Sequence, residues 1–306
     1  FVIINDGSND DSKKIINSYT DRRIKLINNK GNKGITYSLN KGIAQSKGKY
    51  IVRMDVDDIS FKNRIETQVK FMEKNKHIGI SGSWIKKFGQ RYKYPKIRNN
   101  IVEYPTDNDD IFCHLLFFNP IVHPSVIINR NKLLKHNLKY SKKYTHAEDY
   151  RLWVDSINYF DLANIPKPLL KYRVHNSNIS LNTSNSKGIY EDLLSYLEIY
   201  DPKKIDFHYN LASLSFKPTL DYLDRASNWL KHIYEVNNQY NVFHEGILKK
   251  VLAKEWYRLC IYSKSLGVKN IIKYLTNPPI DIEFKLDKFL KLSFKTLFNN
   301  KKFISS

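Results

Sequence analysis

The sequence contains little cysteine and no long apolar run, and each absence excludes a class of protein. Its two cysteines, Cys113 and Cys260, stand far apart in apolar surroundings. A disulfide scaffold or a zinc site needs more cysteines, so we expect two buried free thiols in a reducing compartment. No stretch approaches the roughly 20 apolar residues with which a helix spans a bilayer.

A secretory signal peptide is also not visible. The chain begins at Phe1 instead of methionine, already inside the apolar run 1–4. We therefore expect that a native N-terminus has been lost. The absence of a visible targeting signal then does not exclude any cellular location.

Several binding signatures are missing as well. The loop at 31–36 (GNKGIT) lacks the Gly-Lys-Ser/Thr of a P-loop, and no G-x-G-x-x-G occurs. This argues against an ATPase or a dinucleotide-dependent dehydrogenase. No zinc-finger spacing or RNP-type motif is found, and the lysines are spread along the chain, so a nucleic-acid-binding protein is the weaker alternative.

Acidic residues are few relative to basic ones. Against 51 Lys and Arg stand 30 Asp and Glu, which gives the 306 residues a formal net charge of +21. This charge favours an anionic partner, which could be nucleic acid, an anionic membrane or a phosphorylated substrate. Hydrophobic residues at 42% and aromatics at 13% can fill a real core, in one large domain or a domain with an appendage.

Three of the acids crowd into the stretch 47–60 (KGKYIVRMDVDDIS). Asp55, Asp57 and Asp58 follow a short strand-like run, and such a cluster is costly to hold together without a cation. Residues i and i+2 of a strand share a face, so Asp55 and Asp57 could share a hard cation that in turn holds a diphosphate. The alternative is a solvated acidic turn.

The first 60 residues alternate between strand and helix patterns. Strands are expected at 1–4, 24–27 and 50–52, with helices near 9–19 and 35–46. This order predicts an α/β fold with a mostly parallel, Rossmann-like central sheet flanked by helices. Ligands of such sheets bind outside the carboxyl ends of the strands, so Asp6 and the aspartate cluster should face one crevice.

Beyond residue 185 glycine becomes rare and long helical periods appear. We expect two domains, a catalytic one at 1–185 and a helical C-terminal region at 186–306. The last helix, 284–298, places Leu286, Phe289, Leu290, Phe294 and Leu297 on one face and lysines on the other. It could lie on an anionic membrane or pack on its own domain with its lysines in water.

Five motifs follow one another along residues 1–180: NDGSNDDS, NKGITYSLNKGIAQSKGKYIVRMDVDDISFKNRIETQ, HPSV, AEDYRLW and LLKYRVHNSNIS. In this order and spacing they resemble the motifs of family 2 glycosyltransferases. This resemblance implies the GT-A fold, a nucleotide-diphosphate sugar donor and inversion at the anomeric centre. The family's first strand would lie before Phe1, so this looks like a truncated chain.

The resemblance also implies roles for the N-terminal motif residues. Asp6 would hydrogen-bond the nucleotide base, although the turn begins with Asn5 where the family has Asp. Asp57, with Asp55, would bind Mg²⁺ or Mn²⁺, and Asp55 would contact the ribose or a metal-bound water. The remaining donor-binding candidates are Asn32, Gly34, Asn40, Arg53 and Arg64.

Two later motifs would complete the site. Asp149 aligns with the family's catalytic base, and Glu148 is the alternative, but acids in a helix's first turn can also be purely structural. Tyr172, Arg173 and His175 resemble the family's Y-R-x-H loop, which would close over the diphosphate.

The sequence therefore predicts a metal-dependent inverting glycosyltransferase that uses a UDP-sugar. Its acceptor would be a glycan or a lipid-linked molecule in surface polysaccharide synthesis. We expect it in the cytoplasm, peripheral on the inner face of the cell membrane, with no nucleic-acid partner. A non-catalytic sugar- or lipid-binding scaffold on the same fold is the main alternative.

Overall fold

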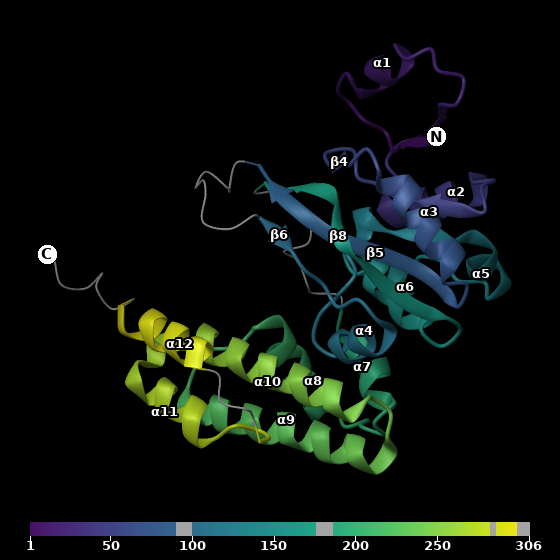
Figure 1. Cartoon of the computed structure of the whole chain (residues 1–306). Coiled ribbons are helices and arrows are strands. Elements are labelled where there is room, and N and C mark those ends of the chain that lie inside the picture. Colours follow the sequence, from purple (N-terminus) through teal and green to yellow (C-terminus); the bar gives the residue numbers. More distant parts are fainter. Residues whose placement is uncertain (90–99, 176–185, 282–285, 299–306) are drawn as a thin grey trace, which may run out of the picture. The chain divides into compact units, whose positions relative to one another are not determined.

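A computed structural model describes residues 1–89, 100–175, 186–281 and 286–298 (Figure 1). The chain divides into two units, which are treated separately below. The first comprises Phe1–Asn108 with Pro120–Ser186, and the second Asp109–Asn119 with Lys187–Ser306. The segment 109–119, which the sequence pattern assigns to the catalytic domain, is therefore part of the second unit.

The first unit holds all the strands that the structure describes. These are β1 (Val2–Asn5), β2 (Lys25–Asn28), β3 (Tyr50–Val52), β4 (Ile59–Ser60), β5 (Ile78–Phe88), β6 (Ile101–Val102), β7 (Ile127–Asn129) and β8 (Asp161–Arg173). Its helices are α1 (Ser12–Asn17), α2 (Ile35–Gln45), α3 (Arg64–Lys74), α5 (Arg130–Lys135) and α6 (Glu148–Ser156), with short 3₁₀ turns at η2 (His123–Ser125) and η3 (Lys142–Tyr144).

The strands form two sheets. Strands β1 and β2 pair in parallel, and the other six form a sheet of order β3-β7-β5-β8-β4 with β6 also on β5. Within the larger sheet β5 and β8 are parallel, whereas the remaining pairs are antiparallel. The α/β class is confirmed, but the sheet is mixed instead of mostly parallel. Three apolar residues in β3 do not encode a strand's partner or direction, and its partner β7 comes from 75 residues later in the chain.

The core of this unit forms where α3 packs on the sheet. Met72 is buried against Ile78, Ile127 and Ala163, which come from β5, β7 and β8. Beside this core, Gly79 meets the ring of Phe160. A Cβ at Gly79 would lie 2.1 Å from that ring, so a larger residue here would have to displace Phe160.

The second unit is helical. It contains α4 (Asn108–Leu115, whose first residue belongs to the first unit), α7 (Lys187–Ser195), α8 (Pro202–Ser213), α9 (Leu220–Tyr240), α10 (Glu245–Tyr262), η5 (Lys264–Leu266), α11 (Val268–Thr276) and α12 (Leu286–Phe298). Cys113 and Cys260 are buried free thiols in this unit, as expected.

A buried histidine links three elements of this helical unit. His208 on α8 accepts a hydrogen bond at Nδ1 from the indole of Trp229, at 3.0 Å, and its Nε2 lies 2.6 Å from the carbonyl of Leu116. Among the described residues, no helix is both long and apolar enough to cross a bilayer.

Candidate active site

The three aspartates after β3 lie together. Ligand oxygens of Asp55, Asp57 and Asp58 are all within 4.8 Å of one another. Strand alternation pairs only Asp55 with Asp57, but the chain turns after β3 and brings the Asp58 carboxylate into the group as well. Asp58 is therefore a further candidate ligand, and its position beside the D-x-D is the sequence signal for it.

Asp55 is paired with a basic neighbour. The Arg53 guanidinium donates two hydrogen bonds to its carboxylate, at 2.8 and 2.5 Å. Burial raises the pKa of Asp55 above its usual value, and Arg53 only partly offsets this effect. Arg53 thus neutralises one of the three charges, as expected for a residue that holds a carboxylate.

Asp58 is the most buried of the three. Its Oδ1 accepts the backbone N–H of Arg173 at 2.8 Å, whereas its Oδ2 is buried with no hydrogen-bond partner. Burial, followed by repulsion from Asp57 and Asp55, raises the pKa of Asp58 to about 6, although the Arg173 N–H lowers it. An unsatisfied buried carboxylate oxygen is costly, so it marks a position where a cation would be favourable.

The Y-R-x-H segment at the end of β8 reaches this cluster. Arg173 donates from Nε to the Asp57 backbone carbonyl at 2.8 Å, and its guanidinium lies over the Phe88 ring. His175 Nε2 is 3.1 Å from Asp57 Oδ2. Tyr172 is the strand residue before Arg173 and pairs with β5 at Lys87. The structure thus brings together two motifs that are far apart in the sequence.

Arg64 has a different position from the one expected of a phosphate ligand. Its guanidinium is buried and donates to the Arg53 carbonyl at 2.7 Å and to Gln68 Oε1 at 3.0 Å. Gln68 in turn donates to the Ser125 carbonyl at 2.7 Å. Burial, and then repulsion from Arg53, lowers the pKa of Arg64 to about 10. Arg64 thus supports the backbone beneath the aspartates, and its expected part in donor binding stays a prediction.

The candidate base lies in the first turn of α6. Asp149 is partly exposed, and its Oδ1 accepts the backbone N–H of Tyr150 at 2.8 Å. Glu148 is buried, with Oε2 lacking a hydrogen-bond partner. Just before them His146 has φ of +68°, in the left-handed region that costs energy for a residue with a side chain. Such local strain is often found at functional sites.

The buried Tyr140 is affected by charges of the α6 acids and of Asp55. Tyr140 Oη is 2.8 Å from His123 Nε2. Burial raises the pKa of Tyr140, Arg53 lowers it, and the carboxylates of Asp149 and Glu148 raise it further. The same burial lowers the pKa of His123 well below its usual value. Tyr140 has no motif signal in the sequence, and its hydroxyl is the hydrogen-bond partner of the buried His123.

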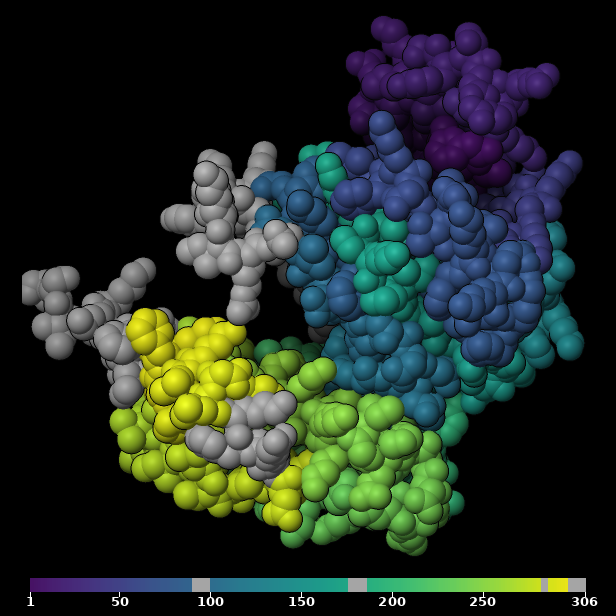
Figure 2. Space-filling model, viewed as in Figure 1, coloured from purple at the N-terminus to yellow at the C-terminus, as the bar shows by residue number. Residues whose placement is uncertain are grey.

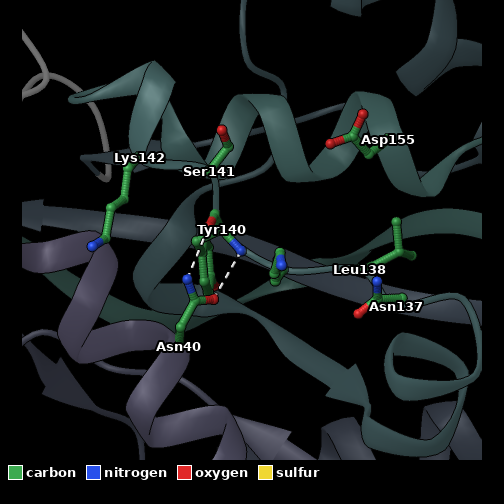
Figure 3. A pocket seen from close by; sticks show the side chains of 8 residues that line it. Asn40, Asn137, Leu138, Tyr140, Ser141, Lys142 and Asp155 are labelled. Atoms are coloured by element: carbon green, nitrogen blue, oxygen red, sulfur yellow. Dashed lines mark hydrogen bonds between the residues drawn. The ribbon is translucent and has the colours of Figure 1, made fainter.

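Asn40 contacts protein backbone. Its amide donates to the Tyr140 carbonyl at 2.8 Å and accepts from the Tyr140 N–H at 2.9 Å, so α2 is joined to the segment before α6 (Figure 3). It also lines a pocket of about 470 Å³, and the other lining residues are Asn137, Leu138, Lys139, Tyr140, Ser141, Lys142 and Asp155. None of the three clustered aspartates is among these lining residues.

The loops after β1 and β2 are joined through Asp6. Its carboxylate accepts hydrogen bonds from the Asn29 amide and from the backbone N–H of Lys33 and Gly34, at 2.7 to 2.9 Å. Asn32 Oδ1 also accepts the Gly34 N–H, at 3.0 Å. Burial alone would raise the pKa of Asp6. The hydrogen bonds from Asn29, Lys33 and Gly34 outweigh this effect, so the pKa is lowered. Contact of this loop with a nucleotide stays a prediction.

Gly7 permits the close approach of these two loops. It has φ of +85°, and a Cβ there would lie 3.0 Å from backbone atoms of Gly31 and Asn32. A side chain at this position would therefore be strained and would push the loops apart.

The aspartate cluster fits a hard divalent cation. Carboxylate oxygens are the ligands that Mg²⁺ and Mn²⁺ prefer, and one from each of the three aspartates lies within 4.8 Å of the others. The free Oδ2 of Asp58 and the partly exposed carboxylate of Asp57 are the groups best able to take part.

Comparison with known proteins gives the family. A family model described as "Glycosyl transferase family 2" matches residues 1–138. An uncharacterised glycosyltransferase from Haemophilus influenzae is 39% identical over 291 residues, which cover 90% of this chain and 86% of the relative. The chain belongs to glycosyltransferase family 2. As a family 2 glycosyltransferase it is a transferase enzyme, and this part of the sequence-based prediction is confirmed.

Two further similarities extend this assignment. The amylovoran biosynthesis glycosyltransferase AmsE of Erwinia amylovora is 29% identical over 146 residues, covering 46% of this family 2 chain and 51% of AmsE. The structure of S. aureus TarS residues 1–349 has a TM-score of 0.50 at 14% identity, covering 87% of this chain and 81% of that one. The latter likeness concerns the fold alone, and it confirms the GT-A assignment.

Proposed function

We propose that this family 2 glycosyltransferase transfers a sugar from a nucleotide-diphosphate donor, a UDP-sugar, with inversion. The acceptor is a glycan or a lipid-linked molecule in surface polysaccharide synthesis. The relationship to AmsE, named for amylovoran biosynthesis, supports the polysaccharide role.

One observation carries the proposal. The aspartates after β3 contact the segment 173–175 at the end of β8, although Asp58 and Arg173 are 115 positions apart in the sequence. Clustered carboxylates next to a cationic side chain are suited to hold a cation together with an anionic diphosphate. A solvated acidic turn would not require a buried Asp58 or a tether from a distant strand.

Each group of residues in the candidate site has a separate role in this proposal. Asp57 and Asp55, with Asp58 beside them, would hold Mg²⁺ or Mn²⁺, which when bound stabilises negative charge on the departing diphosphate. Arg173 and His175 lie beside Asp57 and would help orient that diphosphate. Asp149 takes the proton of the acceptor hydroxyl as its oxygen bonds to the anomeric carbon and the bond to the diphosphate oxygen breaks. A single displacement of this kind inverts the anomeric centre.

We place the enzyme in the cytoplasm, peripheral on the inner face of the membrane. The net charge of +21 supports attraction to an anionic surface. A membrane location would bring the enzyme to a lipid-linked acceptor.

Calorimetric titration tests the donor and the metal together. UDP and then GDP are titrated into the chain with and without Mn²⁺, and into the Asp57→Ala variant. We expect UDP binding that requires Mn²⁺ and is lost in Asp57→Ala. Asp221→Ala, which removes an exposed carboxylate on α9 in the other unit, is the matched control and should bind as the wild type does. Absence of any nucleotide binding by the folded protein would favour the non-catalytic scaffold.

A further inference from the structure

Two neighbouring helices of the second unit expose rows of large apolar side chains. Helix α11 packs beside α12, and both contact α10 (Figure 1). The exposed residues recur every three or four positions, and all six are between 45% and 62% exposed: Val268, Ile272, Leu275, Leu286, Leu290 and Phe294. We call these six side chains the α11–α12 apolar surface.

The packing of each helix explains why these rows face outward. Helix α12 buries Leu292 and Thr296, which lie on its opposite side from Leu290. Helix α11 buries Tyr274 and Asn270, and the Asn270 amide donates to the Cys260 carbonyl at 2.7 Å. Helix α12 therefore packs on its own unit and still exposes an apolar face, and its contact with a membrane stays a prediction.

Lysines flank this surface. Lys291 and Lys295 are exposed on α12, and Lys269 is exposed on α11. Lys288 lies over the Tyr257 ring, 5.5 Å from its centroid. The stretch 264–295 contains seven lysines and three acidic residues. An apolar row bordered by lysines is the pattern of a helix that lies in a lipid interface. Figure 2 shows α12, in yellow, at the molecular surface.

We propose that the α11–α12 apolar surface docks on an anionic lipid bilayer, with both helices lying along the membrane plane. The apolar side chains enter the boundary between headgroups and acyl chains, and the flanking lysines contact anionic headgroups. A second copy of the chain is a poorer occupant, because face-to-face association would bring like-charged lysine rows together. The proposal deepens the membrane location proposed above but uses no residue of the candidate active site.

Vesicle flotation tests this proposal. The full chain is mixed with vesicles of phosphatidylcholine alone or with a third phosphatidylglycerol, and Leu290→Asp is compared with the wild type. We expect the wild type to float with anionic vesicles only, and Leu290→Asp to bind about tenfold more weakly, since a charge replaces an apolar group that inserts. Equal binding of the wild type to both vesicle types would overturn the proposal.

Leu134→Asp is the matched control. Leu134 on α5 is 47% exposed and lies in the other unit, so the same substitution there should leave flotation unchanged. Equal loss in both variants would show that any added negative charge weakens binding, and would overturn the assignment to this surface. A wild type that sediments as a dimer while Leu290→Asp sediments as a monomer would show that a second copy covers the surface.

Insertion is measured separately with Leu290→Trp. Its added fluorescence should shift to the blue with anionic vesicles and be quenched by lipids brominated in the acyl chain. No shift and no quenching would overturn insertion even if vesicles still bind. UDP titration of Leu290→Asp should match that of the wild type, so failure of the membrane proposal and failure of the sugar-transfer proposal can be told apart.

Discussion

Asp58 Oδ1 accepts the backbone N–H of Arg173 at 2.8 Å, across 115 residues of sequence. This bond fixes the loop after β3 to the last residue of β8. It therefore sets the position of Arg173 and of the following His175 relative to the neighbouring Asp57. The candidate diphosphate site depends on this tether as much as on the carboxylates that would hold the cation.

Two substitutions separate the two roles of Asp58. Asp58→Ala removes the acceptor and the charge, and leaves the Arg173 N–H unpaired. We expect a loss of about 1 kcal/mol in the free energy of unfolding and at least about tenfold weaker Mn²⁺-dependent UDP binding. Asp58→Asn keeps an acceptor oxygen, so it should restore the stability but not the binding. Unchanged UDP affinity in Asp58→Ala would contradict the assignment of Asp58 to the site.

Asp149→Asn should separate binding from chemistry. The amide cannot take the acceptor proton, so we expect unchanged Mn²⁺-dependent UDP affinity and a turnover lower by about 10² to 10⁴. Glu148→Gln, the change at the neighbouring acid, should lower turnover much less. Near-normal turnover in Asp149→Asn with a large loss in Glu148→Gln would transfer the base assignment to Glu148.

The Asn40→Ala variant distinguishes a structural role of Asn40 from a role in nucleotide binding. Asn40→Ala removes both hydrogen bonds to the Tyr140 backbone, and should lower the free energy of unfolding by about 1 to 3 kcal/mol. Thermal denaturation without ligand measures this loss. If stability is unchanged while UDP affinity falls, Asn40 is a nucleotide contact, as the family motif implies.

Because His208 is buried, we expect the free energy of unfolding to depend on pH. The indole N–H of Trp229 can only donate, so Nδ1 of His208 must accept and the ring is neutral. Burial lowers the pKa of His208 to about 4. Because the unfolded chain, with a pKa near 6.5, binds more protons between these values, stability should fall as pH drops from about 6.5 to about 4. The full contribution is on the order of 3 kcal/mol.

The measurement is urea unfolding at a series of pH values. His208→Gln should give a flatter stability curve between pH 6.5 and 4 than the wild type. His244→Gln, which changes an exposed histidine of the same unit, should leave the slope unchanged. An unchanged slope in His208→Gln would contradict the buried neutral imidazole.

Much of the fold can be predicted from local sequence. Alternating strand and helix patterns locate β1, β2, β3 and α2 within a few residues, because short apolar runs, turn residues and helical periods are local properties. Strand β8 shows the limit. The sequence does not predict that β8 begins at Asp161, because the strand contains Pro166 and Pro168. Proline lacks a backbone N–H, so two prolines in one segment indicate a loop. Register irregularities in the pairing with β5 between Ser83 and Ile85 accommodate them.

For this protein, the sequence by itself determined the candidate chemistry: the aspartates after β3, the acids that open α6 and the Y-R-x-H segment. It also determined that α12 has an apolar face. Tertiary structure alone decided that the Asp58 carboxylate turns toward Asp55 and Asp57, that Arg64 is buried beneath them and that the apolar face of α12 is exposed. The reason is physical: residue type and spacing are local, whereas burial, strand partner and the covered side of a helix depend on contacts between distant segments.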